Sequence, residues 1–386
     1  MKIKRIEVFP LRLPVRRDFK WAGLRENLGG FVITRLETED GVVGWGEATP
    51  LPDWGGAAGR RGGETQATVV AMIRDVLAPG LIGMNVCDVN AARQAMDRAA
   101  IGNSYAKLAL DIALHDAWGK VLGQPVYNLL GGKVREGIRY AHMVGLMDHA
   151  EAMEEGLAAL ADGCTALQIK GGVDPERDIR LVAELRREGG DAFFMRLDAN
   201  QGYRTARDGI DYLARLKDAG ANGCEQPGAN LSAMVGITQR GALPVMADES
   251  CWDAVDAMEV VQNGAADWIS IYLAKAGGYV GARKVSAIAE TMNIPCDVNG
   301  SIESGIGNAA NLHFVLSQPC VTLPSVIPVN APAGTHPCKV AGNYYTDDII
   351  AQPMALDGDC IAAPVGPGLG IEIDEAKLAK YRQDQA

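Results

Sequence analysis

The sequence predicts an α/β fold, a modified (β/α)8 TIM barrel with an α+β capping domain, and two observations lead to it. First, five short apolar runs each end in one polar residue, and these residues are Lys170, Asp198, Glu225, Asp248 and Tyr272. The steps between them are 28, 27, 23 and 24 residues, each long enough for one strand and one helix, which is the repeating unit of such a barrel. Second, the chain has 386 residues whereas a barrel needs about 250, so a further domain is expected.

Residues 1–130 are predicted to form the α+β capping domain. Residues 2–12 carry the apolar side chains of an edge strand, and residues 31–47 form a hairpin in which Asp40–Gly41 is expected to make a type I′ turn. The last predicted helix of this domain should be capped by Asn103–Ser104 and should end at Gly123. The predicted helices span about 64–77, 88–98 and 103–122.

Residues 138–330 are predicted to form a (β/α)7β-like barrel, and residues 331–386 to return to the capping domain. The barrel should begin near 139–144. Its second strand leads to a helix opened by Asp174 as the N-cap and Pro175 as the first helical residue. The eighth strand is expected near 320–327, where nearby prolines blur the pattern.

The composition excludes several classes of function. The net charge of −11 argues against nucleic acid and anionic membranes as partners. No apolar stretch approaches the roughly 20 residues of a membrane span. Residues 1–4 begin a charged strand rather than a signal peptide, and the eight cysteines form no Cys-x-x-Cys pair, so reduced thiols are expected. We therefore expect a cytoplasmic protein that acts on a small molecule and, as is common for such barrels, forms a homo-oligomer.

Three carboxylates lie at the ends of successive predicted strands, at Asp198, Glu225 and Asp248. Because the carboxyl ends of barrel strands converge on one mouth, these side chains are expected to meet there. An oxygen-only ligand set suits a hard divalent ion, and Mg²⁺ fits best because it takes few protein ligands and leaves positions for substrate. The alternative is that the three acids form salt bridges or cap loops, although without a cation they would repel one another.

Lys170 ends the second predicted strand, beside the expected metal site. Burial and a neighbouring cation would both lower its pKa, so we predict a neutral amine that acts as a general base. The alternative is a salt bridge to one of the carboxylates. Metal and amine base together indicate removal of the proton α to a substrate carboxylate, with the resulting negative charge stabilised by Mg²⁺.

Further motifs accompany these residues along nearly the whole chain. They are 109–114 through 129–132, Gln168–Lys170, Asp198–Asn200, Glu225–Pro227, Ala247–Ser250, Gly277–Gly278 and Pro367–Gly370. With these motifs the sequence resembles the enolase superfamily, in the subgroup of muconate lactonizing enzymes. The resemblance implies a capping domain made from the N- and C-terminal segments, Mg²⁺ on the three acids, and abstraction of an α-proton.

Two positions depart from the pattern of that family. Its Lys-x-Lys on the second strand is Gln168–Ile169–Lys170 here, which keeps the lysine that usually acts as the base. Its opposing lysine on the sixth strand stands five residues before the Gly-Gly pair, and that position is Tyr272. Lys275 lies three residues later, where strand alternation turns it to the other face unless the strand ends first. A racemase needs an acid/base on each side of the α-carbon, so this loss favours β-elimination, with Tyr272 or Lys275 as the acid.

Several polar and aromatic residues are candidates for contact with the substrate. Acids at the end of the seventh strand would suit an amine or imine nitrogen, and loop residues of the capping domain are expected to close over the site. The run 168–171 resembles that of family members that act on hydroxyproline and proline-betaine compounds. The run 297–303 is most similar to that of members that dehydrate cis-3-hydroxy-L-proline. The candidates are Gln168, Asn200, Asp297, Asn299, Glu303 and, in the loops, Trp21, Asp53 and Trp54.

The leading hypothesis is therefore a Mg²⁺-dependent lyase that dehydrates a hydroxylated amino or imino acid. Alternatives are a racemase or epimerase of proline-like or N-acylated amino acids, a cycloisomerase, and, in another class, a catalytically silent relative that only binds a metabolite. An unrelated metal hydrolase on the same fold would lack its usual His ligands.

Overall fold

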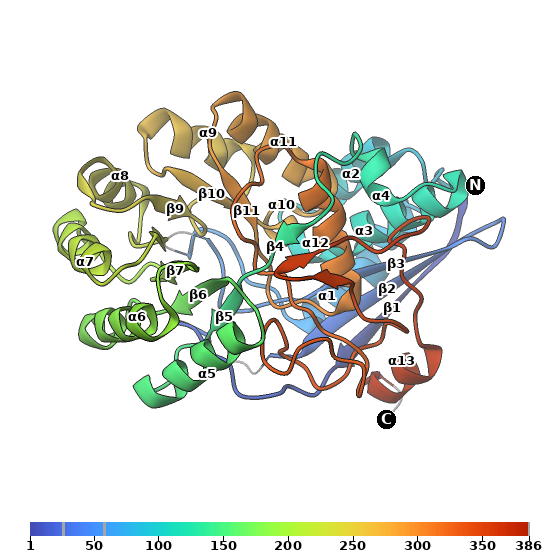
Figure 1. Ribbon diagram of the computed structural model, residues 1–386. Coiled ribbons are helices and arrows are strands. Elements are labelled where there is room, and N and C mark those ends of the chain that lie inside the picture. Colours follow the sequence, from blue (N-terminus) through green and yellow to red (C-terminus); the bar gives the residue numbers. More distant parts are fainter. Residues whose placement is uncertain (25–27, 57–58, 385–386) are drawn as a thin grey trace.

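A barrel and a smaller capping layer lie side by side in the computed structural model, which describes residues 1–24, 28–56 and 59–384 (Figure 1). The barrel carries the strands β5 to β11 with helices around their outside, and the capping layer carries β1 to β3. Both chain ends lie on the side of the capping layer (Figure 1). This arrangement confirms the predicted fold class.

The barrel is built on a parallel sheet whose strands follow one another in chain order from β5 to β11. All five residues of β6 are buried, because helices cover one face of the sheet and side chains fill the interior on the other. The strands are β5 (His142–Val144), β6 (Ala166–Lys170), β7 (Phe194–Asp198), β8 (Gly223–Glu225), β9 (Val245–Ala247), β10 (Trp268–Ile271) and β11 (Cys296–Val298).

A helix follows each of these strands, as the βα spacing predicted. Asp174 is the N-cap of α6 and accepts hydrogen bonds from the N–H groups of Glu176 and Arg177, with Pro175 as the first helical residue, as expected. The helices are α5 (His149–Ala161), α6 (Pro175–Gly189), α7 (Ala206–Asp218), α8 (Leu231–Arg240), α9 (Ala254–Asn263), α10 (Leu273–Ala276), α11 (Tyr279–Thr291) and α12 (Gly305–Ser317).

The segment predicted as the eighth strand forms only isolated bridges. Val321 bridges to Cys296, and Ser325 bridges to Tyr140. Pro319, Pro324 and Pro328 flank these bridges, and a proline offers no N–H group to a ladder. The circle of strands is therefore closed by single contacts rather than by a full strand.

The capping sheet is antiparallel, in the order β1 (Ile3–Arg12), β2 (Gly30–Thr38) and β3 (Val43–Ala48). The hairpin between β2 and β3 was predicted, but the prediction of a type I′ turn within it was wrong. Only Gly41, with φ 81°, has a positive φ in this turn, and the N–H of Thr38 donates to the carbonyl of Val42. A three-residue loop with glycine in the left-handed region makes the turn.

The helices of the capping domain lie close to the predicted positions, but the expected cap of α3 is absent. Asn103 has φ 55° and makes no side-chain cap bond. Instead, the buried carboxylate of Glu64 accepts from the N–H groups of Tyr105 and Ala106 at 2.9 and 3.3 Å. Gly123 ends α3 with φ 64°, as predicted. The helices are α1 (Gln66–Ala71), which continues as one π-helical segment (Met72–Leu77) and a 3-10 turn (Ala78–Gly80), α2 (Val89–Ala99), α3 (Ser104–Leu122) and α4 (Val126–Leu129).

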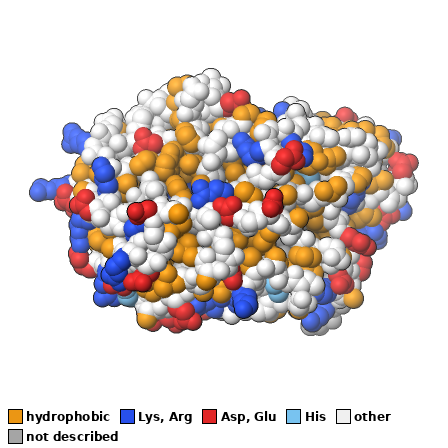
Figure 2. Space-filling view, viewed as in Figure 1, with side chains coloured by type: hydrophobic (Ala, Val, Ile, Leu, Met, Phe, Trp, Pro, Cys, Tyr) orange, Lys and Arg blue, Asp and Glu red, His pale blue; other side chains and the backbone are white. Residues whose placement is uncertain are grey.

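The C-terminal segment runs back across the molecule. Its strands β12 (Leu356–Asp357) and β13 (Cys360–Ile361) pair with β4 (Ile138–Arg139), and α13 (Glu375–Tyr381) packs near β1. Charged side chains of both signs are interspersed on the face that Figure 2 shows. Among the described residues, none of the helices has the length and apolar character needed to cross a membrane.

Two glycines of β3 let the capping sheet approach α3 very closely. A Cβ atom at Gly46 would overlap the carbonyl oxygen of Ala109, and one at Gly44 would overlap that of Ala113. Both obstacles are helix backbone, which cannot move aside as a flexible side chain can.

We therefore expect Gly46→Ala to destabilise the protein by about 2–3 kcal/mol, because α3 would have to move away from the sheet. Urea unfolding should reveal this as a lower midpoint. The matched control is Gly80→Ala, where a Cβ meets nothing within 4 Å. Equal stability of the two variants would contradict this account of the packing.

Candidate active site

Asp198, Glu225 and Asp248, which we call the acidic trio, meet at the mouth of the barrel. Each offers a carboxylate oxygen, and these oxygens lie within 4.8 Å of one another. Parallel register places Lys170, Asp198 and Glu225 at one level, because Lys170 pairs with Asp198 and Asp198 pairs with Glu225. Asp248 follows the end of β9, two residues beyond Met246, which pairs with Glu225. All three side chains are buried.

The loops that follow β7, β8 and β11 hold strained backbone. The non-glycine residues Asn200, Gln201, Gln226 and Ile302 all have φ between 37° and 67°. Each such residue costs about 1–3 kcal/mol and persists where the surroundings enforce it, often at functional sites. The side-chain carbonyl of Gln226 accepts from the N–H groups of Asp248 and Ser250 at 2.9 and 3.1 Å, which fixes the third member of the trio.

The trio fits a hard divalent cation. Burial, together with repulsion from Glu225, raises the pKa of Asp198 to about 7. Burial also raises the pKa of Asp248. Three buried carboxylates with no His or Cys among them form the kind of oxygen donor set that suits Mg²⁺, and a cation there would relieve their repulsion.

Lys170 enters the site from the end of β6 and contacts the trio directly. Its Nζ donates to Asp198 Oδ2 at 2.6 Å and lies 5.4 Å from the ring centroid of Trp21. Burial acts to lower the pKa of Lys170, but the charges of Asp198 and Glu225 outweigh it, so the pKa is raised. The lowered pKa was predicted for Lys170 beside a bound cation; with the carboxylates alone, the alternative salt bridge to Asp198 is the contact seen. A divalent cation on the trio would offset their charge and lower the pKa of Lys170.

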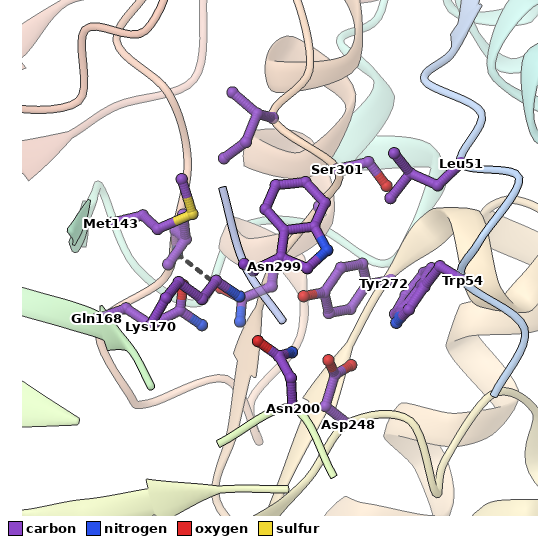
Figure 3. A pocket seen from close by; sticks show the side chains of 14 residues that line it. Leu51, Trp54, Met143, Gln168, Lys170, Asn200, Asp248, Tyr272, Asn299 and Ser301 are labelled. Carbon is purple, nitrogen blue, oxygen red and sulfur yellow. Dashed lines mark hydrogen bonds between the residues drawn. The ribbon is translucent and has the colours of Figure 1, made fainter. Parts of the chain in front are cut away.

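Tyr272 faces Lys170 from the opposite side of the pocket (Figure 3). The ring of Tyr272 packs against Trp54 with centroids 5.0 Å apart and lies 4.4 Å from Lys275 Nζ. Burial, followed by the charge of Asp248, raises the pKa of Tyr272 well above its usual value. At neutral pH the hydroxyl therefore keeps its proton and can donate it.

Lys275, the other candidate acid, points away from the pocket. Its Nζ donates to Asp248 Oδ1 at 2.7 Å and to the carbonyl oxygens of Asp248 and Ser270 at 2.9 and 2.7 Å. It is absent from the described residues that line the pocket. Strand β10 ends before Lys275, and the side chain of Lys275 contacts the carboxylate of Asp248.

Three of the candidate substrate contacts line the pocket and also touch the trio. Gln168 Nε2 donates to Glu225 Oε2 at 2.8 Å, and Asn299 Nδ2 donates to Glu225 Oε1 at 3.4 Å. Asn200 Nδ2 donates to Asp198 Oδ2 and Glu249 Oε1, both at 3.2 Å. The described lining residues are Trp21, Leu51, Trp54, Met143, Gln168, Lys170, Asn200, Asp248, Tyr272, Asn299, Gly300, Ser301, Ile302 and Val326.

The remaining candidates lie outside that lining, among the described residues. Glu303 lies in the segment between β11 and α12, where its carboxylate accepts a hydrogen bond from the N–H of Ser301 at 2.8 Å. Burial raises the pKa of Glu303 to about 7. Asp297 is fully buried deeper in the barrel, and burial raises its pKa to about 6. Asp53 belongs to the loop before α1, beside Trp54.

The sequence analysis did not single out Arg196, which also reaches the trio. Its Nε lies 2.8 Å from Glu225 Oε2 and its Nη2 lies 2.7 Å from Asp297 Oδ2. A signal was present, because an arginine inside an otherwise apolar strand, two residues before Asp198, must share the inward face of that strand.

Comparison with known proteins places this geometry in a family. Residues 6–131 match the family described as the mandelate racemase / muconate lactonizing enzyme N-terminal domain. Residues 151–377 match the one described as the enolase C-terminal domain-like family. The chain belongs to the muconate lactonizing enzyme subgroup of the enolase superfamily. Enzymes of this superfamily use a Lys or His base together with Mg²⁺ to form an ene-diolate, so this chain is an enzyme of α-proton abstraction.

Relatives in the subgroup match the chain over nearly its full length. The L-Ala-D/L-Glu epimerase from Bacillus subtilis is 32% identical over 96% of this chain and 97% of its own. Its solved structure covers 96% of this chain and 99% of its own, with a TM-score of 0.86. The N-succinyl-L-Arg/Lys racemase from Bacillus cereus is 30% identical over 98% of this chain and 97% of its own, and its structure has a TM-score of 0.89 over 99% and 98% of the two chains.

Muconate cycloisomerase 1 from Pseudomonas putida is 33% identical over 98% of this chain and 98% of its own. The structure of the muconate lactonizing enzyme from Pseudomonas putida has a TM-score of 0.87 and covers 99% of this chain and 100% of its own. The subgroup therefore includes epimerases, racemases and cycloisomerases.

We predict that Mg²⁺ affinity depends on pH through Asp198. Its pKa of about 7 means that a proton occupies this ligand below that pH and must leave before the cation binds. The apparent affinity should therefore fall about tenfold for each pH unit below 7 and level off above it. Titration calorimetry between pH 5.5 and 8.5 would measure this, with Asp198→Asn as the control that removes the ligand. Constant affinity across that range would contradict the prediction.

Proposed function

We propose that this enzyme is a Mg²⁺-dependent hydro-lyase that removes water from a hydroxylated amino or imino acid, with cis-3-hydroxy-L-proline as the first substrate to test. The observation that carries the proposal is the pair of residues on the two sides of the pocket. Lys170, an amine, faces Tyr272, a phenol whose pKa burial keeps high (Figure 3).

This pair favours elimination over racemisation. A racemase must remove the α-proton from either face of the substrate, so it needs a group on each side that can act as a base. A phenol with a raised pKa holds its proton at neutral pH and is a poor base, but it remains a usable acid. One base and one acid are what an elimination requires.

Each residue then has a defined task. A Mg²⁺ ion on the trio would supply positive charge that makes the α-proton of a nearby carboxylate more acidic. Lys170 takes the proton from Cα, and the electron pair left behind forms a double bond to Cβ while the Cβ–O bond breaks. Tyr272 gives its proton to the leaving hydroxyl, which departs as water. The enamine that remains tautomerises to the imine, the proton on Lys170 returns to solvent or product, and Tyr272 regains a proton from solvent.

The walls of the pocket support a compact substrate with one carboxylate. Lys170 is the sole cationic side chain among the described lining residues, so a second carboxylate would find no charged partner. Apolar groups of Leu51, Met143 and Val326 suit the methylene groups of a small ring, and the neutral amides of Gln168 and Asn200 suit a nitrogen or hydroxyl group.

The second candidate is an epimerase or racemase of proline-like or N-acylated amino acids. The epimerase and the racemase that match this chain over nearly their full length support it. Tyr272 opposes it for the reason given above. A cycloisomerase is supported by the muconate enzymes. A catalytically silent metabolite binder is the candidate from outside catalysis.

We expect the enzyme with Mg²⁺ to convert cis-3-hydroxy-L-proline to an imine with loss of one water. Proton NMR in D₂O would follow the disappearance of the α-proton and the appearance of product. Proline serves as the matched control, because it has the α-proton but no hydroxyl to lose. Neither product nor deuterium at Cα would reject this substrate. Deuterium uptake with inversion and no loss of water would favour the epimerase.

Substitution of the two facing residues should separate proton removal from loss of water. Lys170→Met should lower both α-proton exchange and product formation by about 10³-fold or more, because the base is gone. Tyr272→Phe should lower product formation by about 10²-fold yet retain exchange of the α-proton with D₂O. If Tyr272→Phe forms product at the wild-type rate, Tyr272 is not the acid.

A further inference from the structure

The layer beneath the trio is polar, which is unusual for the interior of such a barrel. Arg196 lies two residues before Asp198 on β7, and Asp297 lies on β11. Both side chains point inward and are almost completely buried. Barrel interiors are normally filled by bulky branched apolar side chains at this depth. A buried ion pair is weak as a source of stability, because taking two charges out of water costs several kcal/mol per ion. The pair therefore needs another explanation.

The contacts of the trio suggest an explanation for the buried pair of Arg196 and Asp297. Each trio carboxylate has one buried cation beside it: Lys170 lies 2.6 Å from Asp198, Lys275 lies 2.7 Å from Asp248 and Arg196 lies 2.8 Å from Glu225. The two lysines contact no carboxylate outside the trio among the described residues. Arg196 differs, because its other end lies 2.7 Å from Asp297 Oδ2. The guanidinium charge is thus shared between a trio carboxylate and one outside the trio.

The pair also lacks the hydrogen bonds that a purely structural ion pair usually makes. Among the described residues, none of the three guanidinium nitrogens of Arg196 and neither carboxylate oxygen of Asp297 has a partner with hydrogen-bond geometry. The charged atoms are therefore in close contact but in poor geometry for hydrogen bonds. Buried polar groups left in this state call for a functional reason.

We propose that Asp297 is a positioning residue for the metal site that acts through Arg196. By drawing the charge of the guanidinium toward itself, Asp297 leaves Glu225 with more of its negative charge for a cation. Without Asp297, the guanidinium of Arg196 would interact with the carboxylate of Glu225 and with no second carboxylate. Its positive charge under the metal site would then lack the balancing charge of Asp297. Charged partners of metal ligands typically change metal affinity by about 10- to 100-fold. This inference rests on the trio as the Mg²⁺ site.

Titration calorimetry of Mg²⁺ binding to metal-depleted protein at pH 8 tests the proposal without any substrate. Asp297→Asn should lower Mg²⁺ affinity by about tenfold or more. Arg196→Met should bind Mg²⁺ at least as tightly as the wild type, because the competing cation is gone. The double variant Arg196→Met/Asp297→Asn should return to within about threefold of the wild type. A role in packing alone would leave the double variant at least as impaired as Asp297→Asn.

The matched control is Asp116→Asn. Asp116 is an equally buried acid, but it lies on α3 of the capping domain, where it accepts from the N–H groups of Trp45 and Leu369. This variant should lose stability and keep wild-type Mg²⁺ affinity.

The outcomes separate this inference from the proposed function. Wild-type affinity in Asp297→Asn, or a double variant no better than Asp297→Asn, would overturn the role of Asp297 and leave the lyase proposal standing. If Asp297→Asn does not fold, Arg196→Met decides, since a tenfold loss of Mg²⁺ affinity there would also overturn it. Failure of the wild type to bind Mg²⁺ would overturn both the inference and the metal site on which it rests.

Discussion

Repulsion among three buried carboxylates is the constraint on which the rest of this structure depends. Asp198, Glu225 and Asp248 bring oxygens within 4.8 Å of one another in a part of the molecule that excludes water. Such a cluster raises carboxyl pKa values and opposes folding unless positive charge offsets it. The parallel barrel brings the cluster together, because register aligns Asp198 with Glu225 and Asp248 follows the end of the next strand. The fold therefore has to provide compensation nearby.

The compensation comes from three cations placed one to each carboxylate, and their surroundings give them different tasks. Lys170 opens onto the pocket, where it can exchange a proton. Lys275 is fixed by two backbone carbonyls as well as by Asp248, so it is held in place. Arg196 lies one layer deeper and shares its charge with Asp297. The three ion pairs thus differ in their surroundings, and the roles we propose for Lys170 and Arg196 follow from that difference.

The capping domain supplies part of the wall of the pocket at the mouth of the barrel. Trp21 comes from the loop after β1 and lies over Lys170, whereas Trp54 comes from the loop after β3 and packs on Tyr272 and on Trp252 of the barrel. Each facing residue is thereby covered by an indole from the other domain. Exclusion of water strengthens electrostatic interactions in the pocket. Neither domain alone contains the whole pocket, because Trp21, Leu51 and Trp54 of the capping domain line it together with residues of the barrel.

Local pattern was enough to predict a large part of this protein. The spacing of polar residues after apolar runs gave the barrel strands, the acidic trio and Lys170, because side-chain alternation and βα length are properties of short segments. The Asp174–Pro175 start of α6 and the Gly123 end of α3 follow from backbone preferences of single residues. That Tyr272 stands where the family has a lysine followed from the resemblance to the family and not from local pattern.

Other features depended on contacts between distant segments, which no local pattern contains. Glu64 replaced Asn103 as the cap of α3, and a three-residue loop replaced the type I′ turn at Asp40–Gly41. The pKa of Lys170 is raised rather than lowered because carboxylates from three other strands surround it. Asp297 meets Arg196 across the barrel rather than lining the pocket. The sequence by itself determined which side chains reach the mouth of the barrel. Only the tertiary structure decided their charge states and partners, because these depend on distances between groups far apart along the chain.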